Sequence, residues 1–202
     1  MKILAATLNE DMSHELLKAC VVPRPIAWVS TVDSAGVPNL APFSCFTFVA
    51  TDPPMICLSI ALKRSQKKTT LLNLEASRDF VVNIPAEGFE QMVNQTSAEG
   101  PATQNKVTGA GLSVVPSDRV RSPRIAQCAI NMECALSQTV ELGRSRHTLV
   151  IGEVVVFHLD DAILRDGQVD FDSFKPLARL GGENYGEIGR VISAPRSWRK
   201  KA

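Results

Sequence analysis

Residues 23–56 read PRPIAWVSTVDSAGVPNLAPFSCFTFVATDPPMI, and this stretch decides the fold of the chain. The run from Ile26 to Val32 is rich in β-branched and aromatic residues, which favours a strand. Asp33 to Gly36 has the residue types of a turn, and Pro38 to Phe48 has those of a second extended segment. The stretch therefore predicts a hairpin with an irregular second arm.

The second arm contains two prolines, Pro38 and Pro42. Proline has no backbone N–H and cannot donate within a sheet, so this arm is predicted to lie at a sheet edge or at a bulge. Backbone groups beside the prolines are then free to meet a ligand. We expect the functional site at this arm.

Further motifs follow in a fixed order. They are G-x-x-NLAPFS, the exit from Phe46 to Pro54, K-x-T-x-x-N at Lys68, Thr70 and Asn73, the strand Asp79 to Ile84, and HTLVIGEV from His147 to Val154. With PRPIAWVST, they resemble the flavin reductase-like, FMN-binding split-barrel proteins, which include flavoredoxin. The resemblance covers most of residues 20–190. It implies a mainly β fold with inserted helices, a split β-barrel, in a single domain over residues 1–202.

The pattern along the chain predicts six strands and two helices. The strands are expected at Ala27 to Val32, Asn39 to Val49, Met55 to Ala61, Phe80 to Ile84, Ile125 to Val140 and His147 to Leu159. The helices are expected at Lys68 to Ala76 and at Ala86 to Gln95. The polar stretch from Thr96 to Val107 is expected to be a loop or a short helix that covers part of the site.

The last predicted strand, from His147 to Leu159, is apolar on both faces. About 13 residues at roughly 3.3 Å each span about 40 Å, so this strand is expected to bend around a barrel. One face would fill the barrel, and the other needs cover from a helix or from a second copy of the protein. The resemblance implies homodimers with two flavin sites near the interface.

Composition limits the class of partner. The 202 residues are 45% hydrophobic and 21% charged, with a formal net charge of +1. The basic clusters, Lys63 to Lys68 and the tail Arg196 to Lys201, are short, so we expect no nucleic-acid binding. No stretch approaches the roughly 18 apolar residues that span a bilayer, so we expect no membrane insertion.

The chain has five cysteines, at positions 20, 45, 57, 128 and 134, with no C-x-x-C pair and no histidine at ligand spacing. This predicts free buried thiols and no metal site. An odd count without a signal peptide favours a reducing cytoplasm. Cys45 has a second interpretation as a redox thiol, because it lies in the expected ligand loop.

The segment SIALKRSQKKTTLLN, residues 59–73, offers groups for a phosphate. Ser59 ends a strand, several cations follow, and Thr69 and Thr70 begin a helix, whose N-terminus favours anions. Arg24 offers a bidentate fork for the phosphate or another anion. On residues alone, a solvated loop with Thr69 or Thr70 as N-cap is equally supported.

The resemblance implies that Lys68 and Thr70 contact or support the phosphate. Thr69 stands where the family has Asp. Without the aspartate, the helix start lacks a capping carboxylate and a negative charge. This favours a different helix start and tighter binding of phosphate.

The loop from Asn39 to Phe46 offers groups for the flavin ring: an amide, a hydroxyl, backbone groups and aromatic flanks. Ser30 and Thr31 complete a polar edge. The expected contacts are Ser30, Thr31, Asn39, Leu40, Ala41, Pro42, Phe43 and Ser44. Taken alone, Phe43, Phe46 and Trp28 are more typical of core packing.

His147 opens the last strand, and Tyr185 lies in the glycine-rich stretch LARLGGENYGEIG. Both are expected at the barrel mouth, although a lone histidine at a strand start is more often a surface residue. The resemblance implies that His147 approaches the flavin or the nicotinamide, as a hydrogen-bonding or charge-stabilising catalytic residue. The glycines do not have the G-x-G-x-x-G spacing, so they are expected in turns.

These observations predict an FMN-binding oxidoreductase that passes a hydride from NADH or NADPH to flavin and then passes electrons to an acceptor. A redox partner protein is one such acceptor. The chain has no Rossmann fingerprint or P-loop, so the nicotinamide would stack on the flavin. Two alternatives remain open. One is a flavoredoxin-like electron carrier with permanently bound FMN, and the other is a flavin-free binding module on the same barrel.

Overall fold

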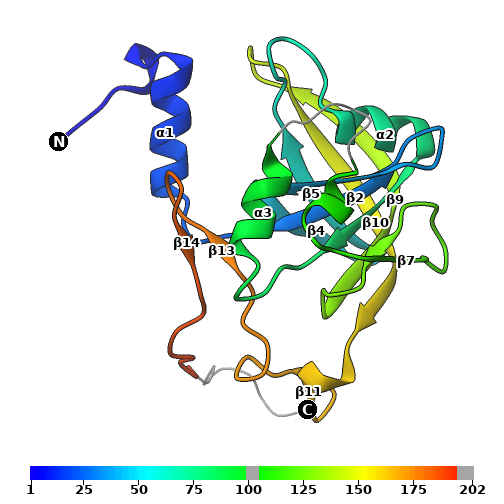
Figure 1. Ribbon diagram of the computed structural model, residues 1–202. Coiled ribbons are helices and arrows are strands. Elements are labelled where there is room, and N and C mark those ends of the chain that lie inside the picture. Colours follow the sequence, from blue (N-terminus) through cyan, green and yellow to red (C-terminus); the bar gives the residue numbers. More distant parts are fainter. Residues whose placement is uncertain (99–104, 195–202) are drawn as a thin grey trace.

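A seven-stranded antiparallel sheet forms the body of the molecule (Figure 1). The computed structural model describes residues 1–98 and 105–194. The strand order is β3-β2-β6-β9-β10-β5-β4. The strands are β2 (Ala27–Val32), β3 (Pro38–Phe43), β4 (Phe46–Thr51), β5 (Pro54–Ile60), β6 (Asp79–Asn83), β9 (Ile130–Leu142) and β10 (His147–Leu159). The predicted mainly β fold with inserted helices is confirmed.

The hairpin in the opening stretch is present as β2 and β3, which pair from Ala27 with Phe43 to Val32 with Pro38. The Asp33 carboxylate accepts hydrogen bonds from two backbone N–H groups of the turn, and Gly36 takes a φ of +80° that suits glycine. Strand β3 lies at the sheet edge, as its prolines predicted.

The prediction that the second arm runs as one strand from Asn39 to Val49 is wrong. The arm breaks at Ser44 and Cys45, and β4 begins at Phe46 on the opposite edge of the sheet. A strand that contains prolines cannot be paired on both sides, so β3 pairs only with β2. The residues that follow form β4, which pairs with β5. The backbone N–H of Ser59 in β5 donates to the Cys45 carbonyl at 2.9 Å, which holds this crossing between the two edges.

Strand β10 has the predicted bounds, and its register against β9 shifts at two places. The first shift is at Ile151 and Gly152, and the second lies between Val154 and Val156. Such irregularities bend a strand, which agrees with the predicted curvature. The single strand predicted from Ile125 to Val140 is wrong, because a turn in which the Cys128 N–H donates to the Ile125 carbonyl separates β8 (Arg124–Ile125) from β9.

Two apolar clusters pack on the two faces of the sheet. One lies inside the curved sheet and is centred on Leu58, Phe80 and Val150. The other contains Trp28 and Leu40 and lies beneath the helices α3 (Glu90–Ser97) and α4 (Lys106–Gly109). The Trp28 indole N–H donates to the Thr96 hydroxyl of α3 at 2.9 Å. The core interpretation of Trp28 is therefore confirmed.

Helix α2 (Thr69–Ser77) agrees with its predicted position to within one residue at each end. Helix α3 begins four residues later than predicted. Residues before it cannot continue the helix, because Ala86 forms an isolated bridge with Pro176 and Gly88 has a φ of +91°.

Helix α1 (Glu10–Cys20) was not predicted. Asn9 caps it by accepting the Met12 N–H, and acidic residues in the first turn and Lys18 in the last turn complement the helix dipole. These signals were present in the sequence. None of the α1 residues is buried, and Figure 1 shows the helix to one side of the sheet. Its position therefore depends on contacts from elsewhere in the chain.

Short strands join the remaining segments. β1 (Arg24–Pro25) pairs with β13 (Ala178–Arg179), and β13 pairs with β14 (Tyr185–Gly186), so the C-terminal hairpin lies beside α1. Strand β7 (Val114–Val115) pairs with β8, and β11 (Leu164–Arg165) pairs with β12 (Gln168–Val169). Two 3-10 helices complete the described elements, at Ala5–Thr7 and Asp161–Ile163.

The prediction of buried thiols is confirmed for Cys57, Cys128 and Cys134 and is wrong for Cys20 and Cys45. Cys20 ends the exposed helix α1, and Cys45 lies in the turn between two edge strands. Burial raises the pKa of the Cys128 thiol to about 12, which keeps it protonated.

Two sequence predictions fall partly or wholly outside the described residues. The basic tail, 196–201, lies outside them, and so does the middle of the expected 96–107 loop, at 99–104. Within the described ranges, no helix is both long enough and apolar enough to cross a membrane.

Candidate functional site

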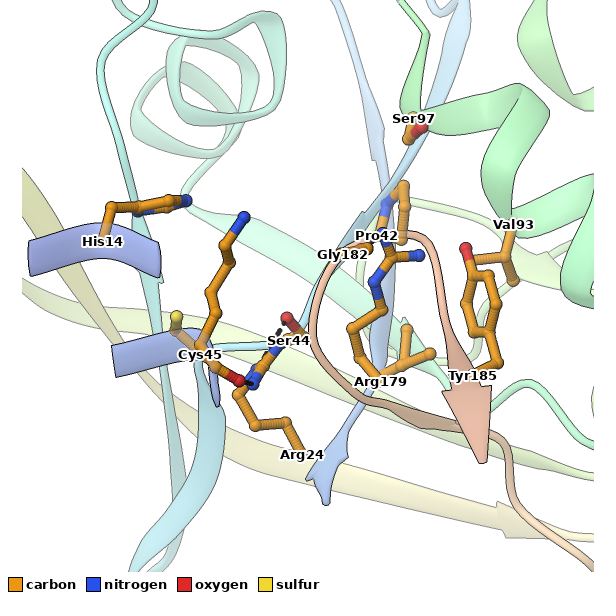
Figure 2. A pocket seen from close by; sticks show the side chains of 12 residues that line it. His14, Arg24, Pro42, Ser44, Cys45, Val93, Ser97, Arg179, Gly182 and Tyr185 are labelled. Carbon is orange, nitrogen blue, oxygen red and sulfur yellow. Dashed lines mark hydrogen bonds between the residues drawn. The ribbon is translucent and has the colours of Figure 1, made fainter. Parts of the chain in front are cut away.

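Two cavities lie along the edge strand β3. The first, called the hairpin cavity, has a volume of about 260 Å³ and lies between α1, the β13–β14 hairpin and the end of β3 (Figure 2). The second, called the α2 cavity, has a volume of about 290 Å³ and lies at the start of α2. Pro42 and Ser97 line both cavities. The two cavities are therefore neighbours that share part of their wall.

The α2 cavity brings together several of the predicted cofactor residues. Asn39, Ala41, Pro42, Phe43, Lys68, Thr69 and Thr70 all line it. The N-cap residue of α2, Lys68, makes no side-chain capping bond, and the first N–H groups of a helix have no partner within the helix. The Asn39 amide donates to the Thr70 hydroxyl at 3.0 Å, which ties β3 to α2. This cavity thus has cationic, hydroxyl and N–H donors on one side.

The Lys68 ammonium lies 5.8 Å from the centre of the Phe43 ring, which brings the cation close to the aromatic wall. Phe43 itself is largely buried in the core of the curved sheet. It therefore combines the two roles that the sequence left open, core packing on one side and a cavity wall on the other.

The hairpin cavity contains three further predicted residues, Arg24, Ser44 and Tyr185. Arg24 does not offer the predicted bidentate fork. Its Nη1 donates to the Lys18 and Val21 carbonyls, Nη2 donates to the Leu180 carbonyl, and Nε donates to the Ser44 hydroxyl. Four of its five N–H groups are used in this way. Arg24 thus holds the cavity walls together, and Figure 2 shows its bond to Ser44.

Three predicted residues lie away from both cavities. Ser30 donates to the Pro123 carbonyl and accepts from Asn83, Thr31 accepts from Asn73, and Leu40 packs beside Trp28. Every residue of β2 is buried, so its hydroxyl groups serve the internal polar network rather than a ligand edge. The prediction that Ser30 and Thr31 form a polar edge of the site is not supported by this arrangement.

Ser59 and His147 face each other at the β5 and β10 ends. The Ser59 hydroxyl and His147 Nδ1 lie 3.4 Å apart. Among the described residues that line the two cavities, neither one is included. The structure therefore brings them together as a pair that is outside the lining of both cavities.

Several lining residues were missed at the level of sequence. In the hairpin cavity they include His14 and Lys18 of α1 and Arg179 of β13. The Arg179 guanidinium carbon lies 4.5 Å from the centre of the Tyr185 ring. Lys63 was considered only as one cation in a loop, and it lines the α2 cavity. No local pattern marks α1 and β13 as neighbours, because their contact depends on pairing between distant segments.

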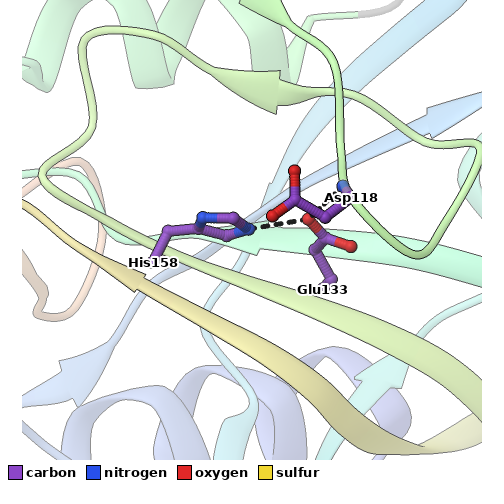
Figure 3. A group of neighbouring side chains, drawn as sticks. All are labelled: Asp118, Glu133 and His158. Atoms are coloured by element: carbon purple, nitrogen blue, oxygen red, sulfur yellow. Dashed lines mark hydrogen bonds and ion pairs between the residues drawn. The ribbon is translucent and has the colours of Figure 1, made fainter.

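One other cluster has the side chains of a metal site (Figure 3). Ligand atoms of Asp118, Glu133 and His158 lie within 4.8 Å of one another. The buried Glu133 carboxylate accepts the backbone N–H groups of Asp118 and Arg119, and His158 Nε2 lies 2.7 Å from it. These contacts explain its burial without an ion, because they pin the loop before β8 to strand β9.

Residues 19–177 match the family model of the flavin reductase like domain. The chain is 32% identical to nitrilotriacetate monooxygenase component B from Bacillus cereus, with a TM-score of 0.91 over 96% of this chain and 98% of that one. It is 27% identical to the 2-nitrobenzoate 2-nitroreductase of Pseudomonas fluorescens, with a TM-score of 0.88 over both whole chains. A split barrel domain protein from Shewanella frigidimarina, 19% identical, has a TM-score of 0.82 over 98% and 100% of the two chains.

The strand arrangement agrees with these similarities. The sheet is curved, its consecutive strands β3 and β4 lie at opposite edges, and the crossing at Ser44 and Cys45 leaves it unclosed. The match covers most of the chain and includes both apolar clusters and the α2 cavity. The chain therefore belongs to the flavin reductase-like family and has its FMN-binding split-barrel fold.

Proposed function

We propose that the protein is an FMN-binding oxidoreductase that uses NADH or NADPH to reduce flavin and passes the electrons to an acceptor. The observation that carries the proposal is the junction of the two cavities at Pro42 and Ser97. One cavity has cationic and hydroxyl donors at a helix N-terminus. The other has an apolar part, at Ile26, Pro42 and Val93, beside cations of its own. FMN has the same division, because its phosphate lies at one end and its flat amphipathic ring at the other.

The residues present fit this group. Lys68, Thr69, Thr70 and the start of α2 would hold the phosphate, since helix N-termini favour anions. The backbone of β3 at Ala41 and Pro42, with Ser44, would line the ring. Edge strand β3 can offer backbone groups that an inner strand cannot. When bound, FMN would supply hydride and electron transfer chemistry.

Thr69 supports the phosphate end of this assignment. It is the first residue of α2 and lines the α2 cavity. A carboxylate at this position, as in the family pattern, would repel a phosphate dianion, and the hydroxyl does not. We infer that this chain holds the phosphate with less negative charge nearby than relatives with Asp.

His147 remains a proposed catalytic residue. Its contact with Ser59 orients the imidazole at the start of β10. A neutral or protonated imidazole could donate a hydrogen bond to a reduced ligand at this end of the barrel. This role is separate from holding the phosphate, and it requires that the bound ring extend beyond the lining of the two cavities toward the start of β10.

We also propose a homodimer through an exposed apolar surface formed by β4, β5, β9 and β10. On this surface, Phe48 is 72% exposed and Phe157 is 51% exposed. An apolar groove of about 270 Å³ lies between them, with Met55, Met132 and Val154 in its lining. Exposed apolar patches with large side chains are typical of protein interfaces.

The activity is tested by the absorption spectrum of the purified protein with FMN, recorded before and after anaerobic addition of NADH or NADPH. Prompt bleaching of the flavin band supports the reductase. Bound flavin that stays oxidised with both donors contradicts it and indicates an electron carrier reduced by a protein partner. A protein that ignores added FMN is a flavin-free module and contradicts the proposal as a whole.

A further inference from the structure

The lining of the hairpin cavity contains three cations. They are Lys18 from α1, Arg24 from β1 and Arg179 from β13, and His14 of α1 lines the cavity as well. Among the described residues that line this cavity, none is an aspartate or a glutamate. The proposed phosphate site at the start of α2 does not account for these side chains, because none of them lines the α2 cavity.

Arg179 is the residue of this lining best arranged to meet a ligand. It is half-buried, its Nη2 donates to the Gly182 carbonyl at 2.7 Å, and its guanidinium lies against the Tyr185 ring. Within the described part of the chain, its recorded partners are a carbonyl and a ring, neither of which carries a charge. Figure 2 shows Arg179 and Tyr185 side by side on the hairpin. The contact with the Tyr185 ring fixes the orientation of the Arg179 guanidinium, and its other N–H groups remain able to donate to an acceptor.

The neighbouring charges are only partly balanced. Arg24 is 6% exposed, and its four hydrogen bonds go to carbonyl and hydroxyl oxygens. Lys18 forms an ion pair of 2.7 Å with Glu15, a glutamate whose side chain is 66% exposed to solvent. Solvent and salt weaken that pair. A buried cation beside a half-buried one therefore gives the cavity a positive potential that an anionic ligand would stabilise.

We propose that the hairpin cavity binds the anionic group of the second ligand of the reaction, a carboxylate or phosphate ester carried by a planar molecule. Arg179 would pair with the anionic group and Tyr185 would contact the planar part. Lys18 would add positive charge from α1, and His14 would add a hydrogen-bonding ring nitrogen. The inference rests on the proposed function, because it takes the α2 cavity as the place of the FMN phosphate. It adds the chemistry by which the partner of FMN is selected.

Two sources have this chemistry. One is the nicotinamide donor, which carries phosphates, and the other is an acidic aromatic acceptor, which carries a carboxylate. ADP-ribose and 2′-phospho-ADP-ribose serve as probes for the first, and benzoate serves for the second. Each probe is titrated by calorimetry into FMN-saturated protein, so that the α2 cavity is already filled.

The test compares the wild type with Arg179→Gln, Arg179→Lys and the control Arg190→Gln. Arg190 is exposed and has no hydrogen bond or ion pair with the residues that the structure describes. We expect at least one probe to lose affinity about ten- to a hundredfold in Arg179→Gln. Arg179→Lys should recover part of this loss, and Arg190→Gln should not change it. Loss for the nucleotide probes identifies the donor, and loss for benzoate identifies an acidic acceptor. Thermal unfolding and FMN affinity, measured for every variant, should equal those of the wild type.

The inference is overturned if no probe binds the FMN-saturated wild type, or if every probe binds Arg179→Gln as tightly as the wild type. Either result leaves FMN binding and flavin reduction untouched, so the proposed function would stand. Failure of the proposed function alone would give a different result. A wild-type protein that binds a probe through Arg179 but never binds FMN would retain the anion site and contradict the proposed function.

Discussion

Arg24 donates a hydrogen bond of 2.9 Å to the carbonyl oxygen of Leu180, a residue 156 positions later in the chain. The same guanidinium bonds the Lys18 and Val21 carbonyls at the end of α1 and the Ser44 hydroxyl after β3. One side chain thus joins the N-terminal helix, the C-terminal hairpin and the edge strand. The hairpin cavity exists because these three segments meet at Arg24.

Replacing Arg24 with methionine should therefore open this wall. The variant leaves three backbone carbonyls without their charged donor, and we expect the unfolding free energy to fall by about 2 kcal/mol. Helix α1 should become sensitive to proteases, since none of its residues is buried. Urea denaturation and limited proteolysis check both effects. Unchanged protection of α1 in the variant would contradict the role given to Arg24.

Lys68→Ala should weaken FMN binding without affecting riboflavin, which has no phosphate. The loss of one charge-assisted hydrogen bond predicts about ten- to a hundredfold weaker FMN binding. The shape of the bound flavin spectrum should not change, because Lys68 acts at the phosphate end. Fluorescence quenching of both flavins measures these affinities.

Lys67→Ala is the matched control, because the Lys67 ammonium pairs with Glu75 at 2.8 Å and lies outside the residues recorded around the α2 cavity. Its FMN affinity should equal that of the wild type. Wild-type protein that binds riboflavin as tightly as FMN would remove the phosphate anchor from the proposal.

The part of the fold that the sequence predicted well is governed by local patterns. The β-branched and aromatic run of β2, the Asp33 turn and the proline-containing edge strand follow from neighbouring residues. The positions of helix α1 and of the strands β13 and β14 depend on contacts between distant segments, such as that between Arg24 and Leu180. No local sequence pattern encodes such contacts. For this reason the sequence predicted Arg24, Ser44 and Tyr185 as site residues but could not predict the α1 and β13 residues that complete the hairpin cavity.

The site itself was predicted unevenly for a related reason. Asn39, Lys68 and Thr70 lie at the boundary between an edge strand and a helix start, and sequence places such boundaries well. Ser30 and Thr31 were expected to complete a polar edge of the site, because they lie toward the end of the strand that pairs with the ligand arm. Both faces of β2 are covered, a fact that depends on how many layers pack against the sheet.

Phe157→Glu should dissociate the proposed homodimer. Phe157 is half exposed beside an apolar groove. In the dimer, the carboxylate of the new glutamate would be buried without a cationic partner among the described residues of the groove. Sedimentation velocity should record a monomer for this variant and a dimer for the wild type. Val114→Glu, another exposed apolar residue that lies on β7, is the control and should remain dimeric. A monomeric wild-type protein would contradict the interface.

Gly152→Ala should destabilise the barrel at the bend of β10. A Cβ atom at this position would lie 2.6 Å from Phe80 Cζ, and Phe80 is fully buried in the core. Phe80 must move, which costs about 1 to 3 kcal/mol of unfolding free energy. Gly109→Ala is the control, because nothing lies within 4 Å of its added Cβ atom. Equal urea midpoints for the Gly152 variant and the wild type would show that the core adapts.

Glu133 should make the stability of the protein depend on pH below neutrality. Burial raises the pKa of its carboxyl, but the N–H groups of Asp118 and Arg119 and the His158 imidazole together hold it below its ordinary value. A lowered pKa in the folded state means that ionised Glu133 stabilises the fold above the pKa of an unfolded glutamate, about 4.3. This stabilisation is lost as the pH falls from there through the lowered pKa.

We therefore expect Glu133→Gln to be about 1 to 3 kcal/mol less stable than the wild type at pH 7, because an amide cannot accept the same charge-assisted bonds. The difference should shrink as the pH falls from about 4.3 toward 3, where the wild-type carboxylate is also lost. Glu141→Gln, an exposed glutamate on the same strand, should change stability by less than about 0.5 kcal/mol at every pH. Urea denaturation of all three proteins across this range measures these effects. A constant difference between the wild type and Glu133→Gln would show that the loop is held by packing and not by the ionised carboxylate.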